Sequence, residues 1–319
     1  MLRVIPIVWL CCWVSPSLHA AEPVATRMRH VVFHLGKGVE MRVDDLNGHL
    51  VSAGSGPPVF DDVSSYVVDI QSARVSLTAE SLTNLLNHYV FAAPNAPLRK
   101  LKIEFEGSEL KQSGVLVKGV PIPFHLRASI SASPDGRIRV HPTSMKAAGF
   151  LSKRVLDFFG LELERLVNVN AATGVTVDGD DLLLDPERLL PPPRIKGRLT
   201  RTWIENGLVV QQFGSPTKHP LTPPNGRFAN YMYYRGGTLR FGKLTMVDTD
   251  MMLVDADQKD AFDFSPEQYN DQLVAGYSKN TRSHGLVVYM PDLADLPRRS
   301  AQARSDAPKA VSARSSTSR

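Results

Sequence analysis

The chain has only two cysteines among its 319 residues, Cys11 and Cys12, and both lie in its apolar first segment. After residue 20 the sequence therefore offers no disulfide, no thiolate metal ligand and no cysteine nucleophile. It also lacks any apolar run close to the ~20 residues that a membrane-spanning helix needs. A hydrophobic core must stabilise the folded part, and roughly 275 residues suffice for one large domain or two modest ones.

Local catalytic signatures are absent as well. The sequence contains no Gly-x-Ser-x-Gly turn, no glycine-rich phosphate loop and no His-Glu-x-x-His helix. An active site assembled from distant strands stays open, but no local pattern favours one. We therefore expect a non-catalytic protein without a cofactor.

Two patterns suggest a metal site, and both are weak. His30 and His34 are four residues apart, but no third ligand follows at a suitable spacing. An EF-hand loop counted from Asp255 has Asp260 where glycine belongs and Pro266 where the bidentate glutamate belongs. The aspartates that first suggest calcium are Asp248, Asp250, Asp255, Asp257 and Asp260. We expect no metal.

The first 20 residues are typical of an export signal. Arg3 supplies a short positive region, Val4 to Val14 an apolar stretch, and Ser17 to Ala21 a small-residue end suited to cleavage. The predicted divisions are a signal peptide at 1–20, a folded domain at 21–296 and a basic tail at 297–319. We expect an exported protein of the periplasm or cell envelope.

Positive charge is concentrated in the tail. Residues 297–319 carry six Lys or Arg and one Asp, a net charge of 6 − 1 = +5, which equals the formal net charge of the whole chain. A Ser/Ala/Arg segment with few large apolar residues is expected to be disordered. Export and a neutral body argue against nucleic acid as a partner. The tail is expected to contact an anionic membrane surface, with a solubilising terminus as the alternative.

One helix is predicted with unusual clarity. Thr78 is a suitable N-cap for a helix over 79–91, and apolar residues recur at the spacing of one helical face. These residues are Leu82, Leu85, Leu86, Tyr89 and Val90. Such a one-sided stripe requires an apolar partner beneath it.

Most of the remaining chain alternates at the period of two that is typical of strands. Strands are predicted at 28–35, 46–52 and 66–77, from Leu101 onward, and at 286–290. Hairpin turns are predicted at Pro134-Asp135-Gly136 and at Asn206-Gly207.

A second helix is predicted from Met145 to Phe159, with Gly160 after it. Its apolar residues lie nearly all round the helix. A helix of this kind is either a core helix or one that covers the sheet while facing an apolar ligand. Both interpretations stay open.

The order of these segments resembles a known family. A helix entry at Val75–Leu86, alternating strands, a second helix and the stretch Gly174–Pro186 are similar to the LmeA-like phospholipid-binding family, over residues 74–214. That family belongs to the TULIP-like tubular lipid-binding folds related to SMP and BPI. The resemblance implies an α+β fold, with a long curved antiparallel sheet wrapped against two or three helices around an apolar groove. A strand-rich extension from about residue 215 departs from the pattern.

We therefore predict an exported envelope protein that binds or carries phospholipid-like molecules. Acyl chains are expected against Leu82, Leu86, Val90, Phe150, Leu151, Val155 and Phe159. Head groups are expected at Arg194, Lys196 and Arg198, which are otherwise a solvated face. The alternatives are a structural or assembly factor of the envelope without bound lipid, and a lipid-modifying hydrolase.

Overall fold

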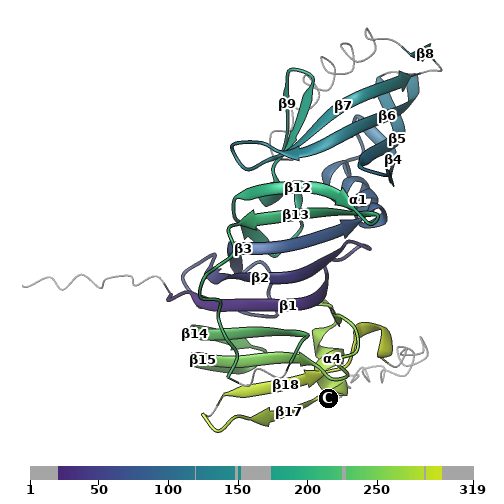
Figure 1. Ribbon diagram of the computed structural model, residues 1–319. Helices are drawn as coiled ribbons and strands as arrows, with labels where there is room; N and C mark the ends of the chain where they lie inside the picture. The colour runs from purple at the N-terminus through teal and green to yellow at the C-terminus, as the bar shows by residue number, and fades with distance from the viewer. Residues whose placement is uncertain are drawn as a thin grey trace, which may run out of the picture.

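The computed structural model describes residues 21–118, 120–147, 150–151, 174–224, 228–283 and 285–296. Two β-sheets, here called sheet A and sheet B, are stacked into an elongated column (Figure 1). The predicted α+β fold with a sheet wrapped against several helices is wrong. The described chain is mostly strand and has three α-helices, each of seven residues or fewer.

Sheet A has eleven strands, in the order β12-β13-β3-β2-β1-β14-β15-β18-β17, with β11 beside β3 and β16 beside β1. Their bounds are β1 Val24–His34, β2 Glu40–Ser52, β3 Tyr66–Thr78, β11 Arg194–Lys196, β12 Leu199–Glu205, β13 Leu208–Gly214, β14 Tyr231–Phe241, β15 Leu244–Asp255, β16 Phe262–Phe264, β17 Tyr277–Asn280 and β18 Leu286–Met290. Pairing is antiparallel except for β11 with β3, β16 with β1 and β15 with β18. The strands after Gly214 extend the same sheet, because β14 pairs directly with β1.

Alternation of side chains explains how these strands form a core. In β1, Val24, Thr26 and Met28 are buried while the residues between them are partly exposed. The phase then changes at exposed His30, whose φ of 46° is in the left-handed region. Because the left-handed residue interrupts the alternation, burial resumes at Val31, while the register with β2 is the same on both sides: Arg29 pairs with Asp45 and Val31 with Val43.

Sheet B has seven antiparallel strands, in the order β4-β5-β6-β7-β10-β9, with β8 beside β7. Their bounds are β4 Leu98–Glu106, β5 Glu109–Lys118, β6 Val120–Ala132, β7 Ile138–Ala147, β8 Phe150–Leu151, β9 Val175–Asp178 and β10 Asp181–Leu184. The chain leaves sheet A after β3, builds sheet B and returns through β11.

The second helix predicted from Met145 is wrong where the structure describes it. Met145 to Ala147 continue β7, and Phe150 and Leu151 form β8. The physical reason is a partner strand, since β6 extends far enough to pair Phe124 with Ala147. Short apolar runs do not distinguish helix from strand, and here the backbone pairing with β6 determines that the segment is a strand. The rest of the predicted helix lies outside the described residues.

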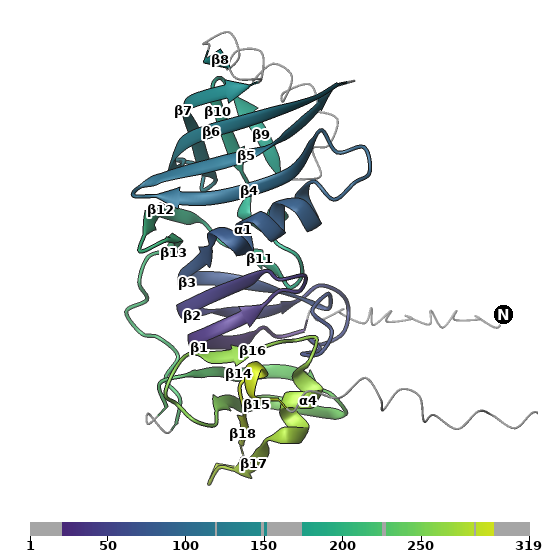
Figure 2. The same ribbon diagram turned by 90° about the vertical axis from the view of Figure 1, so that its right-hand side faces the viewer.

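The first predicted helix is confirmed, with a change of pitch. Helix α1 spans Ala79–Leu85, and the N–H of Ser81 donates to Oγ1 of the N-cap Thr78 over 3.0 Å. The chain then widens into a π-turn, η1, at Leu86–Val90. Helix α1 lies between sheet A and sheet B (Figure 2). The remaining helical elements of the described residues are α3 Pro186–Leu189, α4 Tyr269–Ala275 and the 3-10 turn η3 Leu293–Asp295. In the described part of the chain, no helix is both long enough and apolar enough to span a bilayer.

Candidate functional site

A cavity lies between helix α1 and sheet B and is called the sheet B cavity. Leucines of α1 and η1 form one wall, and strands β4, β7 and β10 form another. The volume open to the centre of a water-sized sphere is about 110 Å³, whereas one water needs about 10–15 Å³ by that measure. Its lining is Leu77, Leu82, Leu85, Leu86, Phe91, Leu98, Ile103, Leu110, Gln112, Ile138, Val140, Val175, Leu182, Leu184, Pro186, Leu189, Leu190 and Gln211.

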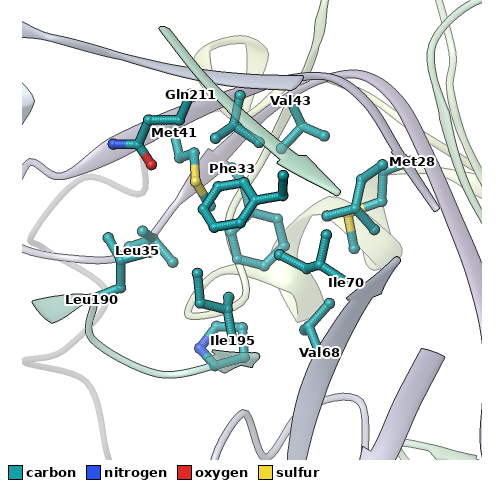
Figure 3. A pocket seen from close by; sticks show the side chains of 14 residues that line it. Met28, Phe33, Leu35, Met41, Val43, Val68, Ile70, Leu190, Ile195 and Gln211 are labelled. Carbon is teal, nitrogen blue, oxygen red and sulfur yellow. The ribbon is translucent and has the colours of Figure 1, made fainter. Parts of the chain in front are cut away.

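A second cavity, the sheet A cavity, lies between one face of strands β1, β2 and β3 and the segment that carries Leu190 and Ile195 (Figure 3). Its corresponding volume is about 40 Å³. Its lining is Met28, Phe33, Leu35, Met41, Val43, Leu46, Val68, Ile70, Val75, Leu190, Pro193, Ile195, Gln211 and Phe213.

The two cavities adjoin, because Leu190 and Gln211 line both of them. Among the described residues that line them, only Gln112 and Gln211 are polar and none is ionisable. The site is therefore an apolar space running from one sheet toward the other. It can bury hydrocarbon, but its described lining residues include no group that could act as an acid, a base or a charged ligand.

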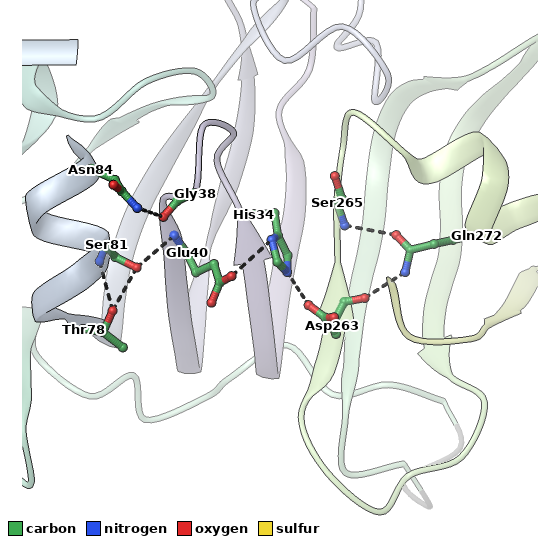
Figure 4. Close-up of polar contacts among 9 residues, drawn as sticks. All are labelled: His34, Gly38, Glu40, Thr78, Ser81, Asn84, Asp263, Ser265 and Gln272. Carbon is green, nitrogen blue, oxygen red and sulfur yellow. Dashed lines mark hydrogen bonds and ion pairs between the residues drawn. The ribbon is translucent and has the colours of Figure 1, made fainter. Parts of the chain in front are cut away.

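Hydrogen bonds hold helix α1 and the π-turn η1, which together form one wall of the sheet B cavity. The Asn87 side chain donates to the carbonyl of Leu101 over 2.7 Å and accepts from the N–H of Leu101 over 3.0 Å. Asn84 donates to the carbonyl of Gly38 over 2.9 Å (Figure 4). The helix is thus fixed to sheet B on one side and to the β1–β2 turn on the other.

The structure brings together part of the predicted acyl-chain site. Leu82 and Leu86 line the sheet B cavity. Val90 does not line it and is buried in the adjoining core with Leu98 and Leu101.

The structure describes two of the other predicted acyl-chain residues, and neither is in a helix. Phe150 and Leu151 are in strand β8, while Val155 and Phe159 lie outside the described residues. The opposing wall consists of strand residues that the sequence analysis did not select. They are Leu98, Ile103, Ile138, Val140, Leu182 and Leu184. A spacing of two was the available signal in β7 and β10, whereas Leu98 and Ile103 are separated by a register shift in β4.

The predicted head-group cations lie on the outside of the sheet A cavity. Arg194 and Lys196 are exposed on β11, on either side of buried Ile195, which lines that cavity. Arg198 is outside β11, and its Nη2 donates to the carbonyl of Pro134 over 2.6 Å. Two of the three cations therefore have exposed side chains next to a cavity wall.

A polar cluster at the end of β1, called the His34 cluster, connects three strands (Figure 4). The His34 ring on β1 pairs through Nε2 with Asp263 on β16, and its Nδ1 is 3.7 Å from Glu40 on β2. The hydrogen bond to Asp263 raises the pKa of His34 despite partial burial. Gln272 of α4 donates to the carbonyl of Asp263 over 2.8 Å and accepts from the N–H of Ser265 over 3.0 Å. His34 therefore has a structural partner and does not pair with His30.

Four carboxylates form the group that could hold a cation in the described part of the chain. They are Asp255, Asp257, Asp260 and Asp292, with one oxygen from each within 4.8 Å of the others. Burial raises the pKa of Asp292 to about 7. Asp255 already accepts from the N–H of Asp257 over 3.0 Å. The other two predicted aspartates, Asp248 and Asp250, lie elsewhere, beside Arg235.

Neither a family model, nor a curated protein, nor a solved structure matches this chain. The resemblance to the LmeA-like family stays a prediction.

Proposed function

We propose that this protein binds phospholipid-like molecules by their acyl chains in the two adjoining cavities and acts as a non-catalytic lipid carrier. The observation that carries the proposal is the sheet B cavity, whose lining is apolar except for two glutamines. Cavities of this character suit apolar ligands, with orientation left to a few polar groups.

Hydrocarbon burial alone supplies useful affinity in such a site. A stretch of about ten methylenes contributes about 8 kcal/mol at ~0.8 kcal/mol each, before the cost of ordering the ligand. Because this attraction does not depend on direction, the head group contributes little to recognition. Binding of several related lipids is expected.

The cavities as described accommodate a segment of an acyl chain. A whole phospholipid requires the α1 wall to move away from sheet B. The π-turn η1 is the irregular part of this wall, and π-turns often occur at functional sites. Opening at η1 would break the two hydrogen bonds between Asn87 and Leu101. Leu86 is the first residue of this turn and lines the cavity.

A binding role is favoured over catalysis by the chemistry of the lining. Acyl or phosphoryl transfer needs an ionisable group, a nucleophile or a bound metal near the reacting atoms. The described lining residues have only hydrocarbon, thioether and amide side chains. Hydrolysis of a bound lipid has no support from these residues.

The cellular setting is part of the proposal. The signal-like residues 1–20 support export to the periplasm or cell envelope, and a membrane is the source of the cargo. Arg194 and Lys196 are the proposed contacts for anionic head groups, because both are exposed beside the sheet A cavity. The basic tail at 297–319 is the proposed tether to the membrane surface.

Native mass spectrometry of the purified protein, combined with lipid extraction, tests the proposal. We expect a protein mass with one or more lipids attached. Leu82→Glu, which places a charge at the sheet B cavity, should abolish lipid retention, whereas Val274→Glu, at an exposed position of α4, should not. Both variants must keep the circular dichroism of the wild type. A wild-type protein that stays lipid-free after incubation with phospholipid vesicles favours the structural role, and a modified lipid product favours a hydrolase.

A further inference from the structure

Gln211 occupies the place where the two cavities meet. It lies on β13 between Val209 and Phe213, and all three side chains are buried. Alternate residues of a strand share a face, so the amide is on the same side of sheet A as these apolar neighbours. Figure 3 shows it on the side of the sheet A cavity where Leu35 and Leu190 also lie.

Gln211 is 94% buried as a residue, and no hydrogen bond between described residues uses its amide. A glutamine amide carries two N–H donors and a carbonyl acceptor, and leaving them without hydrogen bonds in an apolar site destabilises the fold. A leucine would occupy a similar space without this cost.

Another buried glutamine in the same protein is fully used. Gln272 accepts from the N–H of Ser265 and donates to the carbonyls of Asp263 and Pro291, over 2.8–3.0 Å. The fold therefore can satisfy a buried amide where the amide holds the structure together. At Gln211 the amide faces open cavity instead.

We propose that Gln211 is the polar anchor of the ligand, and that the ligand class is acyl ester lipids. An amide N–H of Gln211 donates to the carbonyl oxygen of the ester, while hydrocarbon on either side extends into the two cavities. This inference rests on the proposed lipid-binding function and specifies the cargo. It involves no making or breaking of covalent bonds.

The lining decides which polar group fits beside the amide. No cation lines either cavity among the described residues, so an ionised carboxylate would be buried without a counter-charge at high cost. A pure hydrocarbon would leave the amide unpaired. An ester carbonyl is neutral at every pH and needs only a donor, which the amide supplies.

Competition binding tests the anchor. A dye whose fluorescence rises in apolar surroundings is displaced from the full-length protein by a fatty acid methyl ester, an alkane of equal chain length or the corresponding fatty alcohol. One hydrogen bond in a dry site supports a preference of about ten-fold for ester over alkane. In Gln211→Leu we expect this preference to disappear, with alkane affinity unchanged or higher. The ligand-free variant should melt at a higher temperature than the wild type.

Gln212→Leu is the matched control, because Gln212 is the next residue of β13, is only partly buried and lines neither cavity. This control should retain the preference for ester. Gln211→Met serves as a second variant if the leucine variant does not fold.

Three results would overturn the inference while leaving the proposed function intact: equal wild-type affinity for ester and alkane, stronger binding of the alcohol than of the ester, or an unchanged ester preference in Gln211→Leu. A lower melting temperature of that variant with unaltered affinities would make Gln211 a structural residue. Failure of the wild type to bind dye, ester or alkane would refute the proposed function itself.

Discussion

Replacing Val140 by phenylalanine should fill the sheet B cavity and stabilise the ligand-free protein. Val140 is on β7, is 6% exposed and lines the cavity opposite α1. A larger side chain in a close-packed core forces neighbours apart. Here it can extend into about 110 Å³ of open space instead.

The magnitude follows from the added carbon. Phenylalanine has about four more side-chain carbons than valine, worth up to about 3 kcal/mol at ~0.8 kcal/mol each. Side-chain ordering and small adjustments of neighbours reduce this gain by about half. We expect the free energy of unfolding to rise by about 1–2 kcal/mol, and the melting temperature by about 2–4 °C per kcal/mol.

Thermal and urea unfolding of lipid-free protein measure this effect, and dye displacement measures the loss of acyl-chain binding that should accompany it. Val288→Phe is the control, because Val288 is 1% exposed in the core of sheet A and lines neither cavity. That variant should lose about 1–3 kcal/mol through overpacking. If Val140→Phe loses as much as the control, the space beneath α1 does not exist in solution and the cavity argument fails.

Three further predictions concern the polar contacts. Asp263 raises the pKa of His34 above 6.5, so their ion pair stabilises the fold fully below that pH and is lost as the pH rises through the folded-state pKa. In urea unfolding, His34→Gln should therefore lower the free energy of unfolding more at about pH 5.5 than at about pH 9, and equal losses would contradict this. Burial raises the pKa of Asp292 from 3.8 to about 7, so the free energy of unfolding should fall as the pH rises from about 4 through 7. Asp292→Asn should remove this loss, which is of the order of 2–4 kcal/mol, and parallel pH profiles of the variant and the wild type would refute the prediction. Thr78→Ala removes the cap that accepts from Ser81 and should cost about 1 kcal/mol in unfolding experiments, whereas no change would show that α1 is held by its other contacts alone.

Local signals were sufficient for several elements. Thr78 and the leucine spacing after it predicted α1, and the predicted turns at Pro134-Asp135-Gly136 and Asn206-Gly207 connect β6 to β7 and β12 to β13. The last strand, Leu286–Met290, has the predicted bounds. Each of these depends on residues within a few positions of one another, which the sequence displays directly.

Long-range pairing could not be predicted in this way. Met145 belongs to a strand because β6 provides its ladder, and β1 is internal to sheet A because β14 pairs with it. The fold class was wrong in part because apolar residues near Met145 fit a helical stripe, whereas the β6–β7 hairpin continues far enough to pair Met145 with Leu126 as a strand.

The same limit applied to the site. Leu82 and Leu86 were predicted because one helix carries them both. Val140 and Gln211 were not, because they meet the helix only after sheet B has formed and β13 has paired with β3. A glutamine at an inward position of an otherwise apolar strand was the signal for the polar group.

The route of the chain through the two sheets also determines the order in which paired strands are synthesised. Strand β3 is made early, but the neighbour that pairs with it, β13, follows only after all of sheet B has been synthesised. Until then one edge of β3 is open, and an open strand edge is a template for pairing with other chains. Contacts between strands so far apart also form slowly, because a long loop must close first. A protein built in this way depends on being kept apart from its neighbours while it is still incomplete.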